Sequence, residues 1–246
     1  MTTIQIVLLI AASFIGVFAA WMLRNKTQNK FLSVLLSFSG AYLLGAVVLH
    51  LLPEVFESNT IDDGHDYTAA IYILIGFLIQ LLIVQFTKGI EHGHLHLHDH
   101  FSKGYVAGVV FGLSVHALME GIPLAAPEIS SEQIQPLYWG IVVHKIPETF
   151  ALATVLFFSV KKHSYAFIFT LFFALMTPIG SLAGNYFAKE DAFNFNWLIA
   201  IVCGSLIHIS TTIIFEASGK AHKMSIIKLA VIIGGFGLSL LSAILE

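Results

Sequence analysis

Eight apolar runs, each long enough to cross a bilayer as a helix, dominate this sequence of 246 residues. A spanning helix needs about 20 largely apolar residues. The runs cover residues 4–23, 31–52, 69–86, 105–126, 137–160, 165–187, 197–215 and 226–245. Hydrophobic residues make up 57% of the chain and charged residues only 11%, too few to cover a water-soluble globule of this size. We therefore predict an all-α, multi-pass integral membrane protein with eight transmembrane helices.

Composition also excludes several classes of protein. The single cysteine, Cys203, rules out an internal disulfide framework and a metal cage built from cysteines. A formal net charge of -3 without a dense basic cluster gives no indication of nucleic-acid binding. The first apolar run has no Lys or Arg before it and is longer than the core of a signal peptide. We expect this run to be a retained helix; a cleaved export signal is the alternative.

The charges between the apolar runs predict the orientation of the chain. Ten of the twelve Lys and Arg residues fall in or beside the first, third, fifth and seventh connectors, whereas the second and fourth connectors are acidic. Because Lys and Arg are retained on the cytoplasmic side, we expect both termini to lie outside the cytoplasm. The longest connector, residues 87–104, is too short for a soluble domain, so we predict one membrane domain over residues 1–246.

Two neighbouring runs carry paired ionisable residues. His116 and Glu120 lie in one run and His144 and Glu148 in the next, and each pair is four positions apart, so its members share one helical face. A charge at the bilayer centre costs at least about 2.5 kcal/mol on insertion scales, which makes such residues functional candidates. One pair would be a weak indication, because a His–Glu hydrogen bond satisfies both partners. Two pairs on consecutive helices predict a shared site.

The shared site has the donors of a metal centre. Two neutral imidazoles and two carboxylates can surround a divalent cation, a set that suits zinc and also tolerates Fe²⁺, Mn²⁺, Co²⁺ or Cd²⁺. Pro147 withholds an N–H from the helix and predicts a bend beside Glu148, and Pro123 acts similarly after Glu120. Before His116, glycines recur at four-residue spacing and predict close helix packing: Gly104, Gly108 and Gly112.

With these motifs the sequence resembles the ZIP (Zrt/Irt-like protein) family of metal transporters. The resemblance is carried by HxxxEG from His116, HxxPE from His144, His50-Leu-Leu-Pro-Glu54, Thr177-Pro178 and a histidine-rich third connector, over essentially the whole chain. It implies a homodimeric importer that moves metal toward the cytoplasm, in the cell or plasma membrane. It also implies a 3+2+3 bundle, in which the fourth and fifth helices lie between two inverted three-helix repeats.

Three positions depart from the members of this family that have a two-metal centre. Those members carry further polar or acidic ligands where this chain has Ala117, Lys145 and Thr177. The departures imply that the second metal position is lost, and that the Lys145 ammonium lies where a second cation would be. The alternative for Lys145 is a side chain that extends to the membrane surface. Two carboxylates and one ammonium give the site a formal charge of -1, which a divalent ion changes to +1.

Other histidines and glutamates are candidates for the route to and from the site. His50 and Glu54 are candidates for the entrance on the outer side, with an interfacial cap or a satisfied polar pair as the alternative; His208 and Glu216 are candidates for the cytoplasmic exit. The third connector has five histidines at alternate positions, predicted to collect metal without imposing a geometry: His92, His94, His96, His98 and His100.

Rival functions make different predictions. A zinc-dependent intramembrane hydrolase would need an open coordination position and a separate general base, and the sequence has no HExxH motif. Metal exporters with HxxxD pairs usually have six helices and a soluble domain, so the eight apolar runs disfavour this class. A metal-sensing receptor or scaffold would keep the buried site but would show no metal flux. For a transporter, flux should weaken as the pH falls toward the ordinary histidine pKa of about 6.5, because protonated imidazole cannot coordinate metal.

Overall fold

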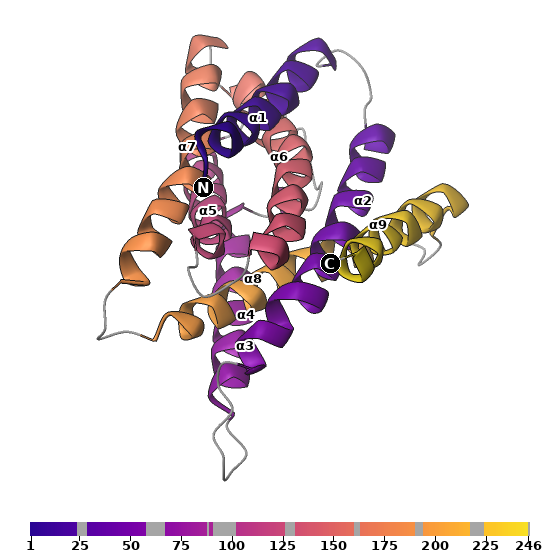
Figure 1. Cartoon of the computed structure of the whole chain (residues 1–246). Coiled ribbons are helices and arrows are strands. Elements are labelled where there is room, and N and C mark those ends of the chain that lie inside the picture. Colours follow the sequence, from indigo (N-terminus) through magenta and orange to yellow (C-terminus); the bar gives the residue numbers. More distant parts are fainter. Residues whose placement is uncertain are drawn as a thin grey trace.

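The structure, a computed structural model, describes residues 1–23, 29–57, 67–87, 89–90, 102–125, 131–159, 163–189, 194–216 and 224–245. These residues are almost entirely helical, with no strand among them (Figure 1). The elements are α1 (Thr3–Leu23), α2 (Asn29–Ala46), η1 (Val47–Leu51), α3 (Leu52–Glu57), α4 (Thr68–Thr87), α5 (Lys103–Gly121), η3 (Ile122–Ala125), α6 (Ser131–Ser159), α7 (His163–Phe187), α8 (Phe195–Glu216) and α9 (Ile226–Leu245). Within the described residues, eight helices are long and apolar enough to cross a membrane, which confirms the predicted all-α membrane fold.

Two of the eight spans differ from the apolar runs by more than two residues at one end. The second continues past residue 52 to Glu57, because η1 and α3 follow α2 without a break. The fifth helix, α6, begins at Ser131 rather than at residue 137, because its first turns are polar and hydropathy does not register them. Hydropathy therefore predicted the position of every span. It did not predict the helix ends that polar residues form.

The second span contains a π-helical segment, η1, just before a proline. The backbone N–H of Leu52 donates to the carbonyl of Val47, five residues earlier, which is the hydrogen bond of a π-helix. Pro53 has no N–H to offer the carbonyl of Leu49. The wider turn accommodates this defect and places His50 inside the protein, where the side chain is buried.

The helices are arranged so that α5 and α6 lie among the others. The main packing partners are α4 with α8, α1 with α6, α2 with α9, and α5 with α7; α6 also packs against α2, and α5 against α4. Figure 1 shows α9 beside α2, on the opposite side of the molecule from α7. Helices α5 and α6, which carry the paired His and Glu residues, therefore have protein neighbours on several sides.

Close helix contacts depend on glycine at defined positions. A Cβ on Gly76 of α4 would collide with the carbonyl of Ile201 on α8, and a Cβ on Gly204 of α8 would collide with the carbonyl of Ile73 on α4. Small residues allow such approach between helices in a membrane. The two glycines thus set the spacing of the α4–α8 pair from both sides.

The predicted glycine stripe on α5 has a packing role in part. Gly108 and Gly112 lie against α4, beside Phe86 and the side chain of Thr87, whereas no atom of the described residues lies within 4 Å of a Cβ position on Gly104. Nearer the end of α5, Gly121 lies against the carbonyl of Thr177 on α7. Helix α5 is therefore held closely by α4 at one level and by α7 at another, on either side of His116.

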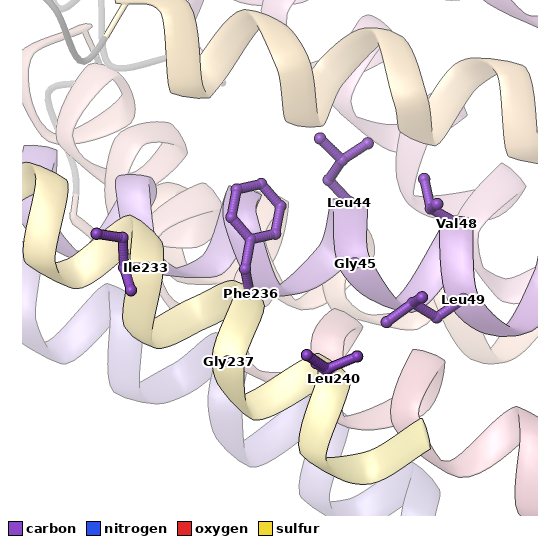
Figure 2. A pocket seen from close by; sticks show the side chains of 8 residues that line it. All are labelled: Leu44, Gly45, Val48, Leu49, Ile233, Phe236, Gly237 and Leu240. Carbon is purple, nitrogen blue, oxygen red and sulfur yellow. The ribbon is translucent and has the colours of Figure 1, made fainter. Parts of the chain in front are cut away.

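An apolar groove runs between α9 and the end of α2 with its continuation η1, on the outside of the bundle (Figure 2). All of its lining residues are apolar: Leu44, Gly45, Val48, Leu49, Ile233, Phe236, Gly237 and Leu240. Several of these side chains are exposed, as expected for a surface that faces lipid. The groove shares no residue with the His and Glu pairs.

Candidate metal centre

The last turn of α5 carries the first pair, His116 and Glu120, and both side chains are fully buried. The α-helix ends directly after them because Pro123 cannot donate to the carbonyl of Met119. The N–H of Ile122 donates to that carbonyl instead, and the chain continues as the short 3₁₀-helix η3. The proline thus ends α5 beside Glu120, in agreement with the disturbance predicted there.

Helix α6 carries the second pair, together with Lys145. His144 and Glu148 are fully buried, and Lys145 between them is 1% exposed. Pro147 does not interrupt the helix, which is continuous from Ser131 to Ser159. The hydroxyl of Thr149 donates to the carbonyl of Lys145 at 2.5 Å, which adds a side-chain hydrogen bond where proline weakens the backbone ladder.

Three side chains converge between the two helices. His116, Glu120 and His144 each offer one atom that could bind a metal ion, and these three atoms lie within 4.8 Å of one another. Nε2 of His116 is 2.9 Å from Oε1 of Glu120, and the centres of the two imidazole rings are 6.2 Å apart. Within the described part of the chain, this is the one group of His, Cys, Asp and Glu close enough to hold a metal ion. Glu148 lies outside this group.

Lys145 links Glu148 to the same centre. Its Nζ is 2.6 Å from Oε2 of Glu120 and 2.7 Å from Oε2 of Glu148, and it lies 4.8 Å from the centre of the Phe173 ring. The ammonium therefore stays inside the protein and does not extend to the membrane surface. A buried charge needs such partners, because removing it from water is expensive.

In both carboxylates, Glu120 and Glu148, only one of the two oxygens contacts the Lys145 ammonium. In Glu120, Oε2 contacts Lys145 and Oε1 lies near His116. In Glu148, Oε2 contacts Lys145, whereas Oε1 is buried and has no hydrogen-bond partner among the residues that the structure describes. One oxygen of each carboxylate is thus held by the ammonium, and the other oxygen is free of it.

Sequence reasoning missed two residues of the centre. Ser39 of α2 lies 3.4 Å from Nδ1 of His144, and Phe173 of α7 lies beside the Lys145 ammonium. No sequence signal marks either residue, because serine and phenylalanine are ordinary in membrane helices. Only the packing of α2 and α7 against α6 reveals them.

The three positions that depart from the two-metal pattern have different surroundings. Ala117 is buried in an apolar cluster with Val109 and Leu113. Thr177 is buried, and its hydroxyl has no hydrogen-bond partner in the described part of the chain. Lys145 is therefore the only one of the three that bears a charge in the centre.

The residues predicted along the route lie outside the three-residue group. His50 is buried in η1, with Nε2 3.4 Å from the hydroxyl of Ser242 on α9. His208 is buried on α8, its ring 4.6 Å from that of Phe77 in an edge contact. Glu54 and Glu216 are half-buried, in α3 and at the end of α8. The tract from His92 to His100 lies outside the described residues.

Comparison with known proteins identifies the group to which the chain is related. The family model described as ZIP zinc transporter matches residues 1–108 and 90–243. Zinc transporter YKE4 of Saccharomyces cerevisiae is 28% identical over 222 residues, which cover 79% of this chain and 63% of that protein. Zinc transporter SLC39A7 of Rattus norvegicus is 30% identical over 106 residues, 37% of this chain and 23% of the relative.

A third relative matches over most of both lengths. Zinc transporter ZIP1 of Danio rerio is 20% identical over 258 residues, 87% of this chain and 85% of the relative. The chain spans less than two thirds of the yeast and rat relatives. The two segments matched by the family model together include almost every residue of the sequence. The chain therefore belongs to the ZIP zinc transporter family.

Proposed function

We propose that this chain carries a divalent metal ion, zinc first, across its membrane into the cytoplasm, and that His116, Glu120, His144 and Glu148 bind one ion on the way. The observation that carries the proposal is the convergence of His116, Glu120 and His144 within 4.8 Å, at full burial between two spanning helices. Family membership and the zinc transporters among the relatives favour transport over catalysis.

The donor atoms suit zinc. Imidazole nitrogens and carboxylate oxygens are common zinc ligands, at about 2.0 to 2.2 Å from the ion. An ion between His116 and His144 would need small side-chain movements to reach that distance. Glu148 is the proposed fourth ligand, because its Oε1 has no hydrogen-bond partner among the described residues. Fe²⁺, Mn²⁺, Co²⁺ and Cd²⁺ accept the same donors, so competition among metals decides the preference.

The position of Lys145 supports one ion rather than two. Its ammonium lies between Glu120 and Glu148, where a second cation would otherwise bridge the same carboxylates. Neither Ala117 nor Thr177 supplies a carboxylate or an imidazole to a second position. The centre is therefore proposed to be mononuclear.

The direction and the assembly of the transporter are part of the same proposal. Import toward the cytoplasm, a homodimer in the cell or plasma membrane, and a 3+2+3 inverted repeat all follow from the resemblance to the family. The distribution of Lys and Arg favours termini outside the cytoplasm, and the shortness of the connectors favours one membrane domain. Accessibility of a single cysteine introduced at either terminus would test the orientation, with Cys203 changed to Ser, and cross-linking in native membranes would test the dimer.

Flux into liposomes tests transport directly. Purified protein should take up ⁶⁵Zn, and Glu120→Gln and His144→Ala should each reduce uptake to the level of protein-free liposomes. Ser37→Ala is the control, because Ser37 is equally buried and its hydroxyl donates, among the described residues, to the carbonyl of Ser33 in its own helix. If wild-type protein moved no zinc, cadmium or iron while Glu148→Ala abolished hydrolysis of a lipid or peptide, the hydrolase would replace the transporter.

A further inference from the structure

The hydrogen bonds around His144 extend beyond α5 and α6 to a serine of α2. Oγ of Ser39 lies 3.4 Å from Nδ1 of His144 and 3.1 Å from the carbonyl oxygen of Leu36. Both Ser39 and His144 are fully buried. Water therefore does not compete for these contacts, and the direction of each hydrogen bond can be worked out from the groups present.

The carbonyl of Leu36 fixes the hydroxyl proton. A carbonyl only accepts, so the Ser39 hydroxyl donates its single hydrogen to Leu36, and its oxygen retains lone pairs that can accept. With that hydrogen given to Leu36, Nδ1 of His144 can form a hydrogen bond to this oxygen only by donating its own hydrogen. In a neutral imidazole with Nδ1–H, the other nitrogen, Nε2, carries the lone pair.

Nε2 of His144 is buried and has no hydrogen-bond partner within the described residues. His144 is also one of the three side chains whose donor atoms lie within 4.8 Å of one another. With Nδ1 directed to Ser39, Nε2 is the nitrogen that can bind a cation. A metal ligand commonly donates its other ring N–H to a second group in this way, which fixes the tautomer and the orientation of the ring.

We propose that Ser39 is a positioning residue for metal binding: its hydroxyl oxygen accepts from Nδ1–H of His144 and so holds the ring with the Nε2 lone pair directed into the centre. The inference rests on the proposed function, because it takes His144 as a metal ligand. It adds a residue of α2 to a site whose ligands come from α5 and α6. The contact spans the packing interface of α2 with α6, where Gly140 of α6 also lies against Tyr42 of α2.

Zinc affinity tests the inference. Titration calorimetry with Zn²⁺ would use full-length protein in which the five histidines of the tract are replaced by serine, so that the tract binds no metal. Ser39→Ala should weaken zinc binding about 10- to 100-fold, the range found for groups that orient metal-bound histidines. Ser39→Thr keeps a hydroxyl and should restore most of the affinity, and Ser37→Ala should leave affinity unchanged.

Nitrogen NMR tests the tautomer separately from transport. In ¹⁵N-histidine-labelled, metal-free protein at alkaline pH, the His144 signals, assigned with His144→Gln, should report Nδ1–H in wild type and a tautomer mixture in Ser39→Ala. An Nε2–H tautomer in wild type, or zinc affinity of Ser39→Ala within twofold of wild type, overturns the inference even if the protein transports zinc. Absent flux together with the expected tautomer and the expected loss of zinc affinity in Ser39→Ala overturns the proposed transport and leaves the role of Ser39 in metal binding in place.

Discussion

Replacing Lys145 by methionine removes the ammonium from the centre while keeping a long, unbranched side chain. In wild type, Nζ contacts Oε2 of Glu120 at 2.6 Å and Oε2 of Glu148 at 2.7 Å. In Lys145→Met, these two carboxylates remain buried without their common counterion. We expect a large loss of stability in metal-free protein and a partial recovery when zinc is added.

The size of the loss follows from the burial of all three groups. Breaking a buried ion pair by removing one partner costs about 3 to 5 kcal/mol, because the remaining charge is uncompensated. Lys145 is 1% exposed and both glutamates are 0% exposed, so no solvent screening reduces this range. For a chain of this length, 1 kcal/mol corresponds to about 2 to 4 °C in Tm, so Tm should fall by about 6 to 20 °C.

Zinc supplies positive charge to the same carboxylates. A ligand that binds only the folded state at 100 times its Kd stabilises the protein by about 2.7 kcal/mol. If the metal neutralises Glu120 and Glu148 in the variant, zinc should raise the Tm of Lys145→Met more than it raises the Tm of wild type. Thermal unfolding in detergent, followed by tryptophan fluorescence with and without Zn²⁺, measures both differences.

Lys189→Met is the matched control, because Lys189 is exposed in the turn after α7 and its loss should change Tm by less than about 2 °C. The reasoning would be refuted by a metal-free Tm for Lys145→Met equal to that of the control. If zinc raised the Tm of Lys145→Met and the Tm of wild type by the same amount, the second step would be refuted, in which the metal and the ammonium neutralise the same charges.

Three further predictions concern stoichiometry, packing and pH. In protein whose tract histidines are replaced by serine, Lys145→Asp should bind two zinc ions per chain where wild type binds one, as measured by elemental analysis; one ion in both would contradict the proposal that the Lys145 ammonium takes the place of a second cation. Gly204→Leu should unfold the protein or lower its stability by at least about 1 to 3 kcal/mol, because the new side chain would collide with the carbonyl of Ile73. Gly234→Leu should be tolerated, because no described atom lies within 4 Å of a Cβ position there; size-exclusion and thermal assays measure both outcomes. Zinc flux at equal pH on both sides should be lower at acid than at alkaline pH, because protons compete with zinc for the histidine nitrogens; flux that does not change with pH would argue against the histidines as ligands.

The sequence predicts the fold well because burial in lipid restricts the chain to a few solutions. Eight runs without water-soluble surface must become helices, since each backbone group has to be bonded within its own segment. Hydropathy does not detect what happens at helix ends. It missed the polar start of α6 at Ser131 and the continuation of the second span through η1, where Pro53 is accommodated rather than ending the helix.

The candidate centre is predicted only in part, because its residues differ in how much information their positions carry. The spacing of His116 and Glu120 alone predicts that they share a helical face, and the structure places Nε2 of His116 2.9 Å from Oε1 of Glu120. The contact of Lys145 with both carboxylates depends on the relative depth of α5 and α6, which no local pattern specifies. Ser39 depends on a third helix and on the choice of one serine among several in α2.

Three of the proposed ligands follow one arrangement, in which one polar atom is held by the protein and another is left for the ion. The carboxylates of Glu120 and Glu148 each give one oxygen to Lys145, and His144 directs Nδ1 toward Ser39. Side chains held in this way lose less conformational freedom when a cation arrives, so more of the binding energy is retained. The same arrangement limits the charge: with neutral histidines the centre changes from -1 to +1 on binding one divalent ion, and a second ion would raise it to +3 away from water. A single ion per centre is therefore what this combination of two carboxylates and one lysine favours, and the stoichiometry of Lys145→Asp is the measurement most sensitive to it.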